Sequence, residues 1–485
     1  MNYRMILRLL CSVLRIVAAF MIPAAVISIC YGEMPTFWGF IITMALMLLL
    51  SLTAFIFPAQ KKTFYAREAF VLASITWLMV SVLGCLPFVI GGAIPRFIDA
   101  LFETASGFTT TGSSIVTDYG MLTMGAKYWR SFTHWLGGMG VLVFLLSIEP
   151  ITSGSGSGDS IHIMRAESPG PQVSKLVPHT LGSARILYLI YMFFTVLMFG
   201  FLMAGGMNVF DAVTTAFATA GTGGFALTAE SIGAYSPYIQ WVVAVFMMLF
   251  GVNFGIYYLV LQRQFKKALR NSELWVYLIV MLLSTTVIFY FVRPQYGTED
   301  GLRNSFFQVS AIMTSTGFAT ADFNVWPQFA RTLLVGLMLM GACAGSTGGG
   351  FKVSRVIMLF KALQRELKRS LHPNSVAKVH IDGESISSET IDNTYAFLVA
   401  YCLIVIFSTI VLSLDNTSFE TNLTAVISCL NNIGPGLDMV GPMGGYSEFS
   451  VLSKIVLILN MLLGRLEIFP ILILFVPGVW KKARN

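Results

Sequence analysis

Long apolar segments and short apolar segments alternate along this chain in a repeated order. A helix needs about 20 mainly apolar residues to cross a lipid bilayer. Segments of sufficient length are predicted to be transmembrane helices. They are residues 5–30, 36–57, 69–88, 128–147, 186–207, 239–261, 274–292, 331–360, 395–414 and 451–480.

Four further apolar stretches are too short to cross a bilayer, and each runs into a glycine flanked by small, hydroxyl or amide residues. Their length suits half-helices that enter the membrane and turn back. They are residues 97–108, 209–220, 302–313 and 419–430.

After the first two spans, the order is long helix, half-helix, glycine loop and long helix, four times over. Irregular backbone at membrane depth is tolerated only where it lines water or is buried in protein, so four loops imply one shared cavity. We predict an all-α membrane protein with ten transmembrane helices, four re-entrant half-helices and a channel-like pore of fourfold pseudosymmetry. The predicted divisions are two additional N-terminal helices (1–68), repeat 1 (69–150), a cytoplasmic loop (151–181), repeat 2 (182–270), repeat 3 (271–370) and repeat 4 (371–485).

Composition and charge agree with a membrane protein. The chain is 56% hydrophobic and 11% charged, whereas soluble domains carry about a quarter charged residues. The net charge of +7 gathers in alternate connections, which places those connections and both termini in the cytoplasm by the positive-inside rule. The expected partner is therefore the lipid bilayer and not nucleic acid.

The four glycine loops carry the candidate chemistry. Selecting K⁺ requires several oxygens to replace its water shell, and rings of backbone carbonyls do this. Glycine permits the left-handed conformations that turn successive carbonyls toward one axis. We predict a potassium filter, with K⁺ in the pore and no covalently bound cofactor. Its residues are Thr110, Thr111, Gly112, Gly221, Thr222, Gly223, Ser315, Thr316, Gly317, Asn432, Ile433 and Gly434.

A dense run of glycines interrupts the span 331–360. The run ends in Phe351-Lys352-Val353, so it does not fit the phosphate-loop pattern, in which lysine directly follows glycine. A mid-membrane break again requires a cavity. We predict an intramembrane gate loop at 341–351, below the filter, formed mainly by Gly345, Ser346, Thr347, Gly348, Gly349 and Gly350.

Arg465 lies within the last predicted span, where a charge marks a functional site. Two interpretations stay open for it. It is either a positive plug that repels cations near the gate, or a structural tie to the backbone carbonyls of residues 345–350 or to a carboxylate.

Two other classes of function compete with a potassium pore as explanations of this pattern. An ion-coupled secondary transporter, such as a K⁺/H⁺ or K⁺/Na⁺ symporter or a carrier of another small solute, would often show two inverted repeats. The charge pattern instead gives four repeats of one orientation. A membrane-embedded enzyme would need a clustered catalytic set, and the spans hold only isolated acids.

From residue 69 onward, the four loops and the glycine-rich break resemble the superfamily of potassium transporters built from four M1-P-M2 repeats. The two N-terminal spans favour its TrkH type over the shorter KtrB type. The resemblance implies K⁺ uptake across a bacterial inner membrane, a filter, a gate and an arginine at position 465 beside it. It also implies a homodimer with a cytosolic TrkA-like nucleotide-binding regulatory ring. Loops 2 and 4 depart from the hydroxyl-rich pattern, which predicts softer discrimination against sodium.

Overall fold

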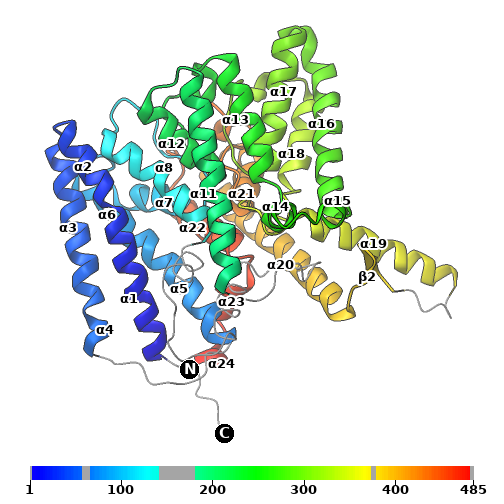
Figure 1. The fold of residues 1–485 in the computed structure, drawn as a ribbon, viewed down its shortest axis with the longest axis horizontal. Helices are drawn as coiled ribbons and strands as arrows, with labels where there is room; N and C mark the ends of the chain where they lie inside the picture. Colours follow the sequence, from blue (N-terminus) through cyan, green and yellow to red (C-terminus); the bar gives the residue numbers. More distant parts are fainter. Residues whose placement is uncertain (1–2, 57–65, 141–180, 373–377, 481–485) are drawn as a thin grey trace.

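The computed structural model describes the chain except for residues 1–2, 57–65, 141–180, 373–377 and 481–485. The N-terminal helices lie together at one edge of the molecule (Figure 1). α3 packs against α1 and α2, and Pro23 lies in the first turn of α2, where its missing N–H breaks no helical hydrogen bond. These helices are α1 (Tyr3–Phe20), α2 (Ile22–Cys30), α3 (Met34–Ser51) and α4 (Thr53–Ile56).

Four groups of helices follow, and each contains an outer helix, a half-helix and a second helix. The first group is α5 (Ala66–Gly84), α6 (Leu86–Ile90), α7 (Phe97–Phe108) and α8 (Met124–Gly138). The second is α11 (Leu181–Ala204), α12 (Val209–Ala220), α13 (Pro237–Phe250), α14 (Phe254–Leu261) and α15 (Phe265–Leu269). The third is α16 (Ser272–Tyr296), α17 (Thr298–Met313), α18 (Gln328–Met338) and α19 (Val353–Leu371). The fourth is α20 (Ser388–Leu412), α21 (Phe419–Leu430), α22 (Val451–Arg465), α23 (Phe469–Leu474) and α24 (Pro477–Trp480).

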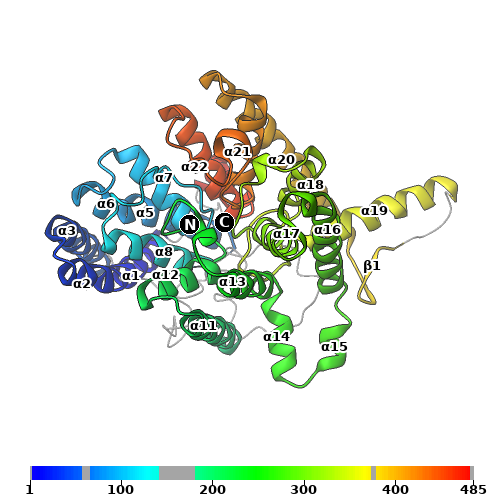
Figure 2. The same cartoon turned by 90° about the horizontal axis from the view of Figure 1, so that it is seen from above.

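Short elements join these helices. In the described residues, the one departure from an all-helical chain is a small antiparallel hairpin between α19 and α20, formed by β1 (His380–Ile381) and β2 (Glu384–Ser385). The 3₁₀ turns are η1 (Ser231–Ala234), η2 (Phe323–Val325), η3 (Ser413–Asp415) and η4 (Asp438–Val440). Seen from above, the groups surround a common centre, and α19 extends away from the body (Figure 2).

The half-helices match the sequence prediction closely. α7, α12 and α21 have the predicted bounds, and Asn208 and Ser418 cap α12 and α21 by accepting hydrogen bonds from backbone N–H groups at 2.8 and 3.1 Å. α17 begins at Thr298, four residues earlier than predicted. Its first turn contains Glu299 and Asp300, whose charges favour a helix N-terminus, so the helix extends into sequence that is not apolar.

The second helices are interrupted more often than the sequence suggested. α13 and α14 are separated at residues 251–253 and bent by 87°, where one continuous span had been expected. α18 and α19 are separated by residues 339–352, as predicted. The expected span 451–480 was wrong as a single helix: it ends at Arg465, because Glu467 and Ile468 adopt left-handed conformations that a helix cannot include.

Six described helices are long and apolar enough to cross a membrane, and the bent pair α13–α14 makes a seventh. The other three predicted crossings are the second helices of groups 1, 3 and 4. The end of the predicted span 128–147 and nearly all of the predicted loop 151–181 lie outside the described residues.

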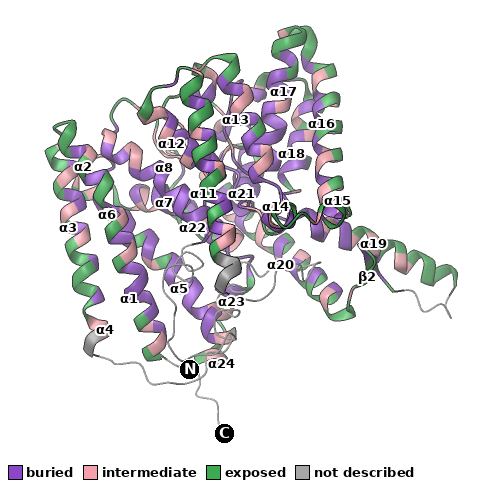
Figure 3. Cartoon of the chain, in the orientation of Figure 1, coloured by how far each residue is buried: buried purple, intermediate pink, exposed green. Residues whose placement is uncertain are grey.

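The outer helices carry many exposed residues, whereas the centre of the molecule is mostly buried (Figure 3). Many of the exposed residues on the outer helices are large and apolar, and buried threonine, serine and asparagine gather on the half-helices and their loops. On α16, for example, Ile279, Leu282 and Leu283 are exposed, and Ser284 and Thr285 are buried. This arrangement suits a molecule whose rim faces lipid and whose centre holds polar groups.

Candidate ion pathway: four glycine loops and a buried glycine-rich segment

Each half-helix ends in the same backbone turn. In loop 1 (109–112), the N–H of Thr110 donates to Gly107 O and that of Thr111 to Ser106 O, which is a Schellman ending. The left-handed residue of this ending is usually glycine, but here it carries a side chain in all four loops. These residues are Thr110 (φ 56°), Thr222 (φ 53°), Ser315 (φ 56°) and Asn432 (φ 54°).

Two residues after each left-handed residue comes a glycine of positive φ. This alternation turns successive carbonyls, and it costs about 1–2 kcal/mol at each non-glycine residue. Such strain persists only where the surrounding structure imposes it, and it gathers at functional sites. The glycines are Gly112 (φ 80°), Gly224 (φ 73°), Gly317 (φ 75°) and Gly434 (φ 105°).

These four glycines close the loops into a ring. A Cβ atom on Gly112 would collide with the carbonyl oxygen of Gly223, which lies in the next loop. In the same way Gly224 abuts Thr316 O, Gly317 abuts Ile433 O, and Gly434 abuts Thr111 O. The sequence of contacts therefore runs from loop 1 (109–112) to loop 2 (221–224), loop 3 (314–317), loop 4 (431–434) and back to loop 1.

The ring corrects the predicted register of loop 2 by one residue. Thr222 and Gly224 have the positive φ angles that Thr110 and Gly112 have, and Gly223 occupies the position of Thr111. The glycine equivalent to Gly112 is thus Gly224, whereas the sequence pattern had placed Gly223 there and had included Gly221. Consecutive glycines hid this register, since either could have been the turn residue.

Several polar side chains of the four loops form hydrogen bonds to other groups of the protein. The Thr109 and Thr111 hydroxyls are 2.8 Å apart, and those of Thr314 and Thr316 are 2.7 Å apart. The Asn432 amide donates to Thr111 Oγ1 and to Met461 O, both at 2.9 Å. The oxygens this ring presents in common are therefore backbone carbonyls.

The glycine-rich segment (341–352) lies directly against this ring. The N–H of Gly349 donates to the Ser315 hydroxyl at 2.6 Å, and the N–H of Phe351 donates to Asn431 Oδ1 at 3.2 Å. The two ends of the segment are joined by a hydrogen bond from Gly341 N–H to Phe351 O at 2.9 Å. The predicted gate residues 345–350 are thus adjacent to loops 3 and 4.

The break between α13 and α14 holds the same segment from another side. The N–H of Cys343 donates to Gly251 O at 3.1 Å, and the N–H of Phe254 donates to Gly345 O at 3.0 Å. The Thr347 hydroxyl donates to Phe250 O at 3.3 Å. Backbone groups freed by the bend are therefore satisfied by the glycine-rich segment, as intramembrane breaks require.

Arg465 lies between the ring and the segment. Its guanidinium donates to the Thr110 hydroxyl at 3.2 Å, to Thr347 O at 3.0 Å and to Gly138 O at 2.6 Å, and it also contacts Gly137 O. The tie to a gate-loop carbonyl that the sequence suggested is present. The same position places a positive charge beside loop 1, so the plug hypothesis stays open.

Four further charged residues around the segment were not predicted from the sequence. Glu273 Oε1 accepts hydrogen bonds from Ala344 N–H at 2.7 Å and Ser354 N–H at 3.0 Å. Lys352 Nζ donates to carbonyls of Gly348 and Gly349, and Arg355 is ion-paired with Glu467. All four are buried. The signal available was a charge at the margin of a predicted span for Glu273, and a charge within a predicted span for the other three residues.

At the outer ends of the half-helices, acidic residues are mostly paired. Asp99 accepts from Lys454 at 2.6 Å, Asp300 pairs with Arg303, and Glu420 pairs with Arg331. Glu103, although near a helix start in sequence, lies deep in α7 and pairs with Arg130 on α8 at 2.6 Å. Lys454 joins group 4 to group 1 through Asp99, and Arg331 joins group 3 to group 4 through Glu420, whereas the other two pairs lie within one group. All four pairs reduce the negative charge that these acids present to cations.

Taken together, four half-helices that end in a ring of carbonyls, enclosed by apolar outer helices, define the class of multi-pass membrane proteins that move cations through a central pathway. The chain belongs to the TrkH family of cation transport proteins, which it matches over residues 39–292 and 278–482. This is a family of transporters and not of enzymes, as the sequence predicts.

Individual relatives agree with this assignment. The Trk system potassium uptake protein TrkH of Escherichia coli K12 is 34% identical over 430 residues, covering 87% of this chain and 88% of the relative. The protein of the same name from Halomonas elongata is 33% identical over 492 residues, covering 99% and 100%. The crystal structure of the potassium transporter TrkH from Vibrio parahaemolyticus superposes with a TM-score of 0.86 at 28% identity, covering 99% and 100%.

Proposed function

We propose that this chain takes up K⁺ across the bacterial inner membrane through a pore in which loops 1–4 select the ion. The observation that carries the proposal is the closed ring in which each positive-φ glycine abuts a carbonyl of the next loop. Dehydrated K⁺ requires several carbonyl oxygens held at once. That relatives are named potassium uptake proteins supports K⁺ as the ion.

The proposed filter ligands are carbonyls of the residues at and before the four ring glycines. They are those of Thr110, Thr111 and Gly112 in loop 1, Thr222, Gly223 and Gly224 in loop 2, Ser315, Thr316 and Gly317 in loop 3, and Asn432, Ile433 and Gly434 in loop 4. Because the loops differ in side chains, we expect weaker discrimination against Na⁺ than a fully symmetric filter gives.

The glycine-rich segment is the proposed gate. It hydrogen-bonds Ser315 directly, and Arg465 connects its Thr347 carbonyl to Thr110. Displacing the segment would open the path beneath the filter. Arg465 would then act by its charge, by its hydrogen bonds or by both.

Assembly and orientation belong to the same proposal. We propose both termini in the cytoplasm, a homodimer, and a cytosolic TrkA-like nucleotide-binding ring that acts on the gate. The clustering of Lys and Arg in alternate connections supports the orientation. The family assignment supports the dimer and the ring.

The decisive experiment is rubidium-86 uptake into proteoliposomes that contain only this protein. External K⁺ should suppress uptake far more than Na⁺ or Li⁺ does. Gly317→Ser should alter that ranking, since its side chain would collide with Ile433 O. Gly336→Ser is the matched control, because a Cβ at Gly336 meets no atom within 4 Å.

Equal suppression by K⁺ and Na⁺, or identical behaviour of the two serine variants, would overturn the filter. Folded protein that takes up no rubidium alone but does so after addition of the regulatory ring would assign the barrier to the gate. No rubidium uptake either with or without the regulatory ring would overturn the proposed pore.

A further inference from the structure

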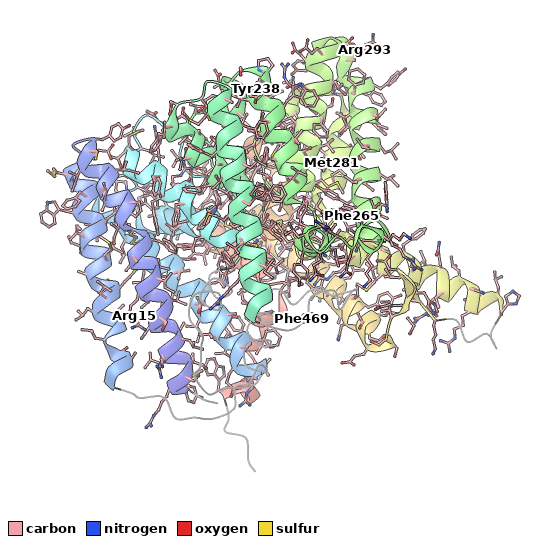
Figure 4. All side chains as sticks on the ribbon, viewed as in Figure 1. Arg15, Tyr238, Phe265, Met281, Arg293 and Phe469 are labelled. Atoms are coloured by element: carbon pink, nitrogen blue, oxygen red, sulfur yellow. The ribbon has the colours of Figure 1, made fainter. Side chains whose placement is uncertain are left out.

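Residues 254–272, which we call the basic elbow, connect α13 to α16 through α14 and α15. The elbow leaves α13 at the 87° bend and extends outward from the body of the molecule (Figure 2). Phe265 marks the elbow beside one end of α16, and Arg293 marks the opposite end of that helix (Figure 4). The elbow therefore lies at one face of the helical bundle.

Cationic side chains dominate the elbow. Arg263, Lys266, Lys267 and Arg270 are all exposed, and the sequence from 254 to 272 contains no aspartate or glutamate. The adjacent Glu273 is buried against the glycine-rich segment, and Asp382 from the hairpin accepts a hydrogen bond from Ser272 N–H at 2.9 Å. The four cations thus present a concentrated positive charge to whatever lies beside the elbow.

Large apolar side chains alternate with these cations. Leu261 is 66% exposed, Phe265 53% and Leu269 60%. Trp275, 49% exposed, donates from its indole N–H to Leu269 O at 2.7 Å. Such a mixture of basic, apolar and tryptophan side chains is typical of segments that lie in the interfacial layer of a bilayer.

The apolar residues of the elbow continue the lipid-facing surface of α16. Trp275 leads along that helix to the exposed Ile279 and Leu282. A soluble partner that covered the cations would leave this apolar strip exposed to lipid. A phospholipid contacts both features, because its headgroup meets the cations and its acyl chains meet the apolar strip. The arrangement therefore favours phospholipid over a protein as the occupant.

Both ends of the elbow are fixed to the glycine-rich segment. At its start, Phe254 N–H donates to Gly345 O at 3.0 Å, next to the Cys343 N–H bond to Gly251 O at 3.1 Å. Just past its end, Glu273 accepts from the N–H groups of Ala344 and Ser354. A force on the elbow is therefore transmitted to the segment from two sides.

We propose that the basic elbow binds anionic phospholipid headgroups and that this binding biases the position of the glycine-rich segment. The headgroup phosphate would lie among Arg263, Lys266, Lys267 and Arg270, with acyl chains against Leu261, Phe265 and Leu269. The binding part stands on its own. The effect on transport rests on the proposed gate.

Binding is tested first, without transport. Purified full-length protein is reconstituted with trace spin-labelled phosphatidylglycerol or phosphatidylcholine, and the motionally restricted fraction of each is measured. The wild type should prefer the anionic lipid, and high salt should reduce that preference because headgroup attraction is screened. Equal restriction of the two lipids at low salt would overturn the proposal.

Charge removal locates the site. Replacing Arg263, Lys266, Lys267 and Arg270 by Gln should reduce the preference by about tenfold, since each basic residue near an anionic surface adds attraction. The matched control replaces Lys361, Arg365, Lys368 and Arg369 on α19 by Gln. Equal losses in the two variants would show non-specific attraction and overturn an elbow site. If the fourfold elbow variant fails to fold, Lys266→Gln with Lys267→Gln, compared with Lys368→Gln with Arg369→Gln, makes the same test.

Coupling is tested by rubidium uptake at increasing phosphatidylglycerol content. Uptake should change several-fold in the wild type and should lose this dependence in Glu273→Leu. This variant removes the oxygen that accepts from Ala344 N–H and Ser354 N–H, but it retains the elbow and therefore its lipid preference. Uptake that is independent of lipid charge while binding is intact would overturn the coupling. If the regulatory ring stimulates uptake by the wild type but not by the elbow variant, the elbow would instead be assigned to protein docking. No uptake in any lipid would count against the proposed pore and leave the binding result standing.

Discussion

The hydroxyl of Ser315 accepts a hydrogen bond from the backbone N–H of Gly349 at 2.6 Å, which joins loop 3 directly to the glycine-rich segment. In loop 1, the equivalent Thr110 hydroxyl accepts from Arg465, which also holds Thr347 O. Both hydroxyls belong to left-handed residues at the ends of half-helices. Moving the segment must therefore release the Ser315 hydroxyl and the bond from Arg465 to Thr347 O, which links the proposed gate to the proposed filter.

Ser315→Ala should loosen this link and raise rubidium uptake. A hydrogen bond contributes about 1 kcal/mol net, which corresponds to about a fivefold change in an equilibrium. The uptake rate in proteoliposomes should rise by up to that factor, with little change in thermal stability. Thr332→Ala is the control, because its hydroxyl is exposed and bonds only within its own helix, to Gln328 O at 2.9 Å. Equal uptake rates for Ser315→Ala and the wild type would show that the hydrogen bond from Gly349 to Ser315 does not hold the gate closed.

The register of loop 2 can be tested through His134. Alanine at Gly223 would collide with the His134 ring, whereas alanine at Gly224 would collide with the Thr316 carbonyl and must also adopt φ 73°. The left-handed conformation alone costs about 1–2 kcal/mol. His134→Ala should therefore restore K⁺ selectivity to Gly223→Ala and not to Gly224→Ala. Competition of K⁺ and Na⁺ against rubidium measures this, and rescue of Gly224→Ala without rescue of Gly223→Ala would return the ring position to Gly223.

The sequence predicts the helical class, three half-helices to the residue and the glycine-rich break, because length and hydropathy report directly on membrane crossing. It does not predict the break at Glu467 and Ile468, whose φ angles of 54° and 69° contradict their intrinsic preferences. Tertiary contacts impose that conformation. The carboxylate of Glu467 is ion-paired with Arg355, which lies 112 residues earlier in the chain.

The site follows the same division. In loops such as Thr110-Thr111-Gly112, the pattern alone finds the glycine of positive φ. Loop 2 contains Gly221, Gly223 and Gly224, so its register depends on which carbonyl of the neighbouring loop each glycine meets. Similarly, the role of Glu273 depends on two backbone N–H groups more than 70 residues away, which no local pattern encodes.

Arg465→Ala should raise the rubidium uptake rate under both hypotheses for this residue, by about tenfold or more. Charge-assisted hydrogen bonds contribute about 1.5–3 kcal/mol each, and the guanidinium makes several. Arg465→Lys separates the hypotheses because it keeps the charge and loses the planar set of donors. A lysine variant that stays slow supports the plug, and one that behaves as alanine supports the tie. An unchanged rate in folded Arg465→Ala would exclude both the plug and a tie that limits transport.

Acid should weaken the connection that the Asp438 carboxylate makes with the start of α21, within group 4. Hydrogen bonds from Ser418 and Thr421 lower the pKa of Asp438 below its ordinary value of 3.8. The Asp438 carboxylate therefore stabilises the fold above pH 3.8, and this contribution disappears as the pH falls through the lowered pKa. Thermal unfolding of wild type and Asp438→Asn should differ at pH 6 and converge as the pH falls below 3.8. A constant difference across this range would contradict the assignment.

The Glu103–Arg130 pair should determine both stability and selectivity. Its side chains are at most 1% exposed, and one Glu103 oxygen accepts from the N–H of Ile115 at 3.0 Å while Arg130 donates to Ala226 O at 3.3 Å. The pair thus joins the chain just after loop 1 to the chain just after loop 2. Glu103→Gln leaves Arg130 buried without its counter-charge, which costs about 3–5 kcal/mol.

Removing both charges separates the two effects. In Glu103→Leu combined with Arg130→Met, no buried charge is left unpaired, so thermal stability should recover relative to Glu103→Gln. K⁺ selectivity should stay impaired, because Ile115 N–H and Ala226 O still lack their partners and the two loops are no longer held together. Asp300→Asn is the control: that carboxylate is 55% exposed, and breaking its pair with Arg303 should cost less than about 1 kcal/mol. A double variant as selective as the wild type would restrict the pair to a structural role.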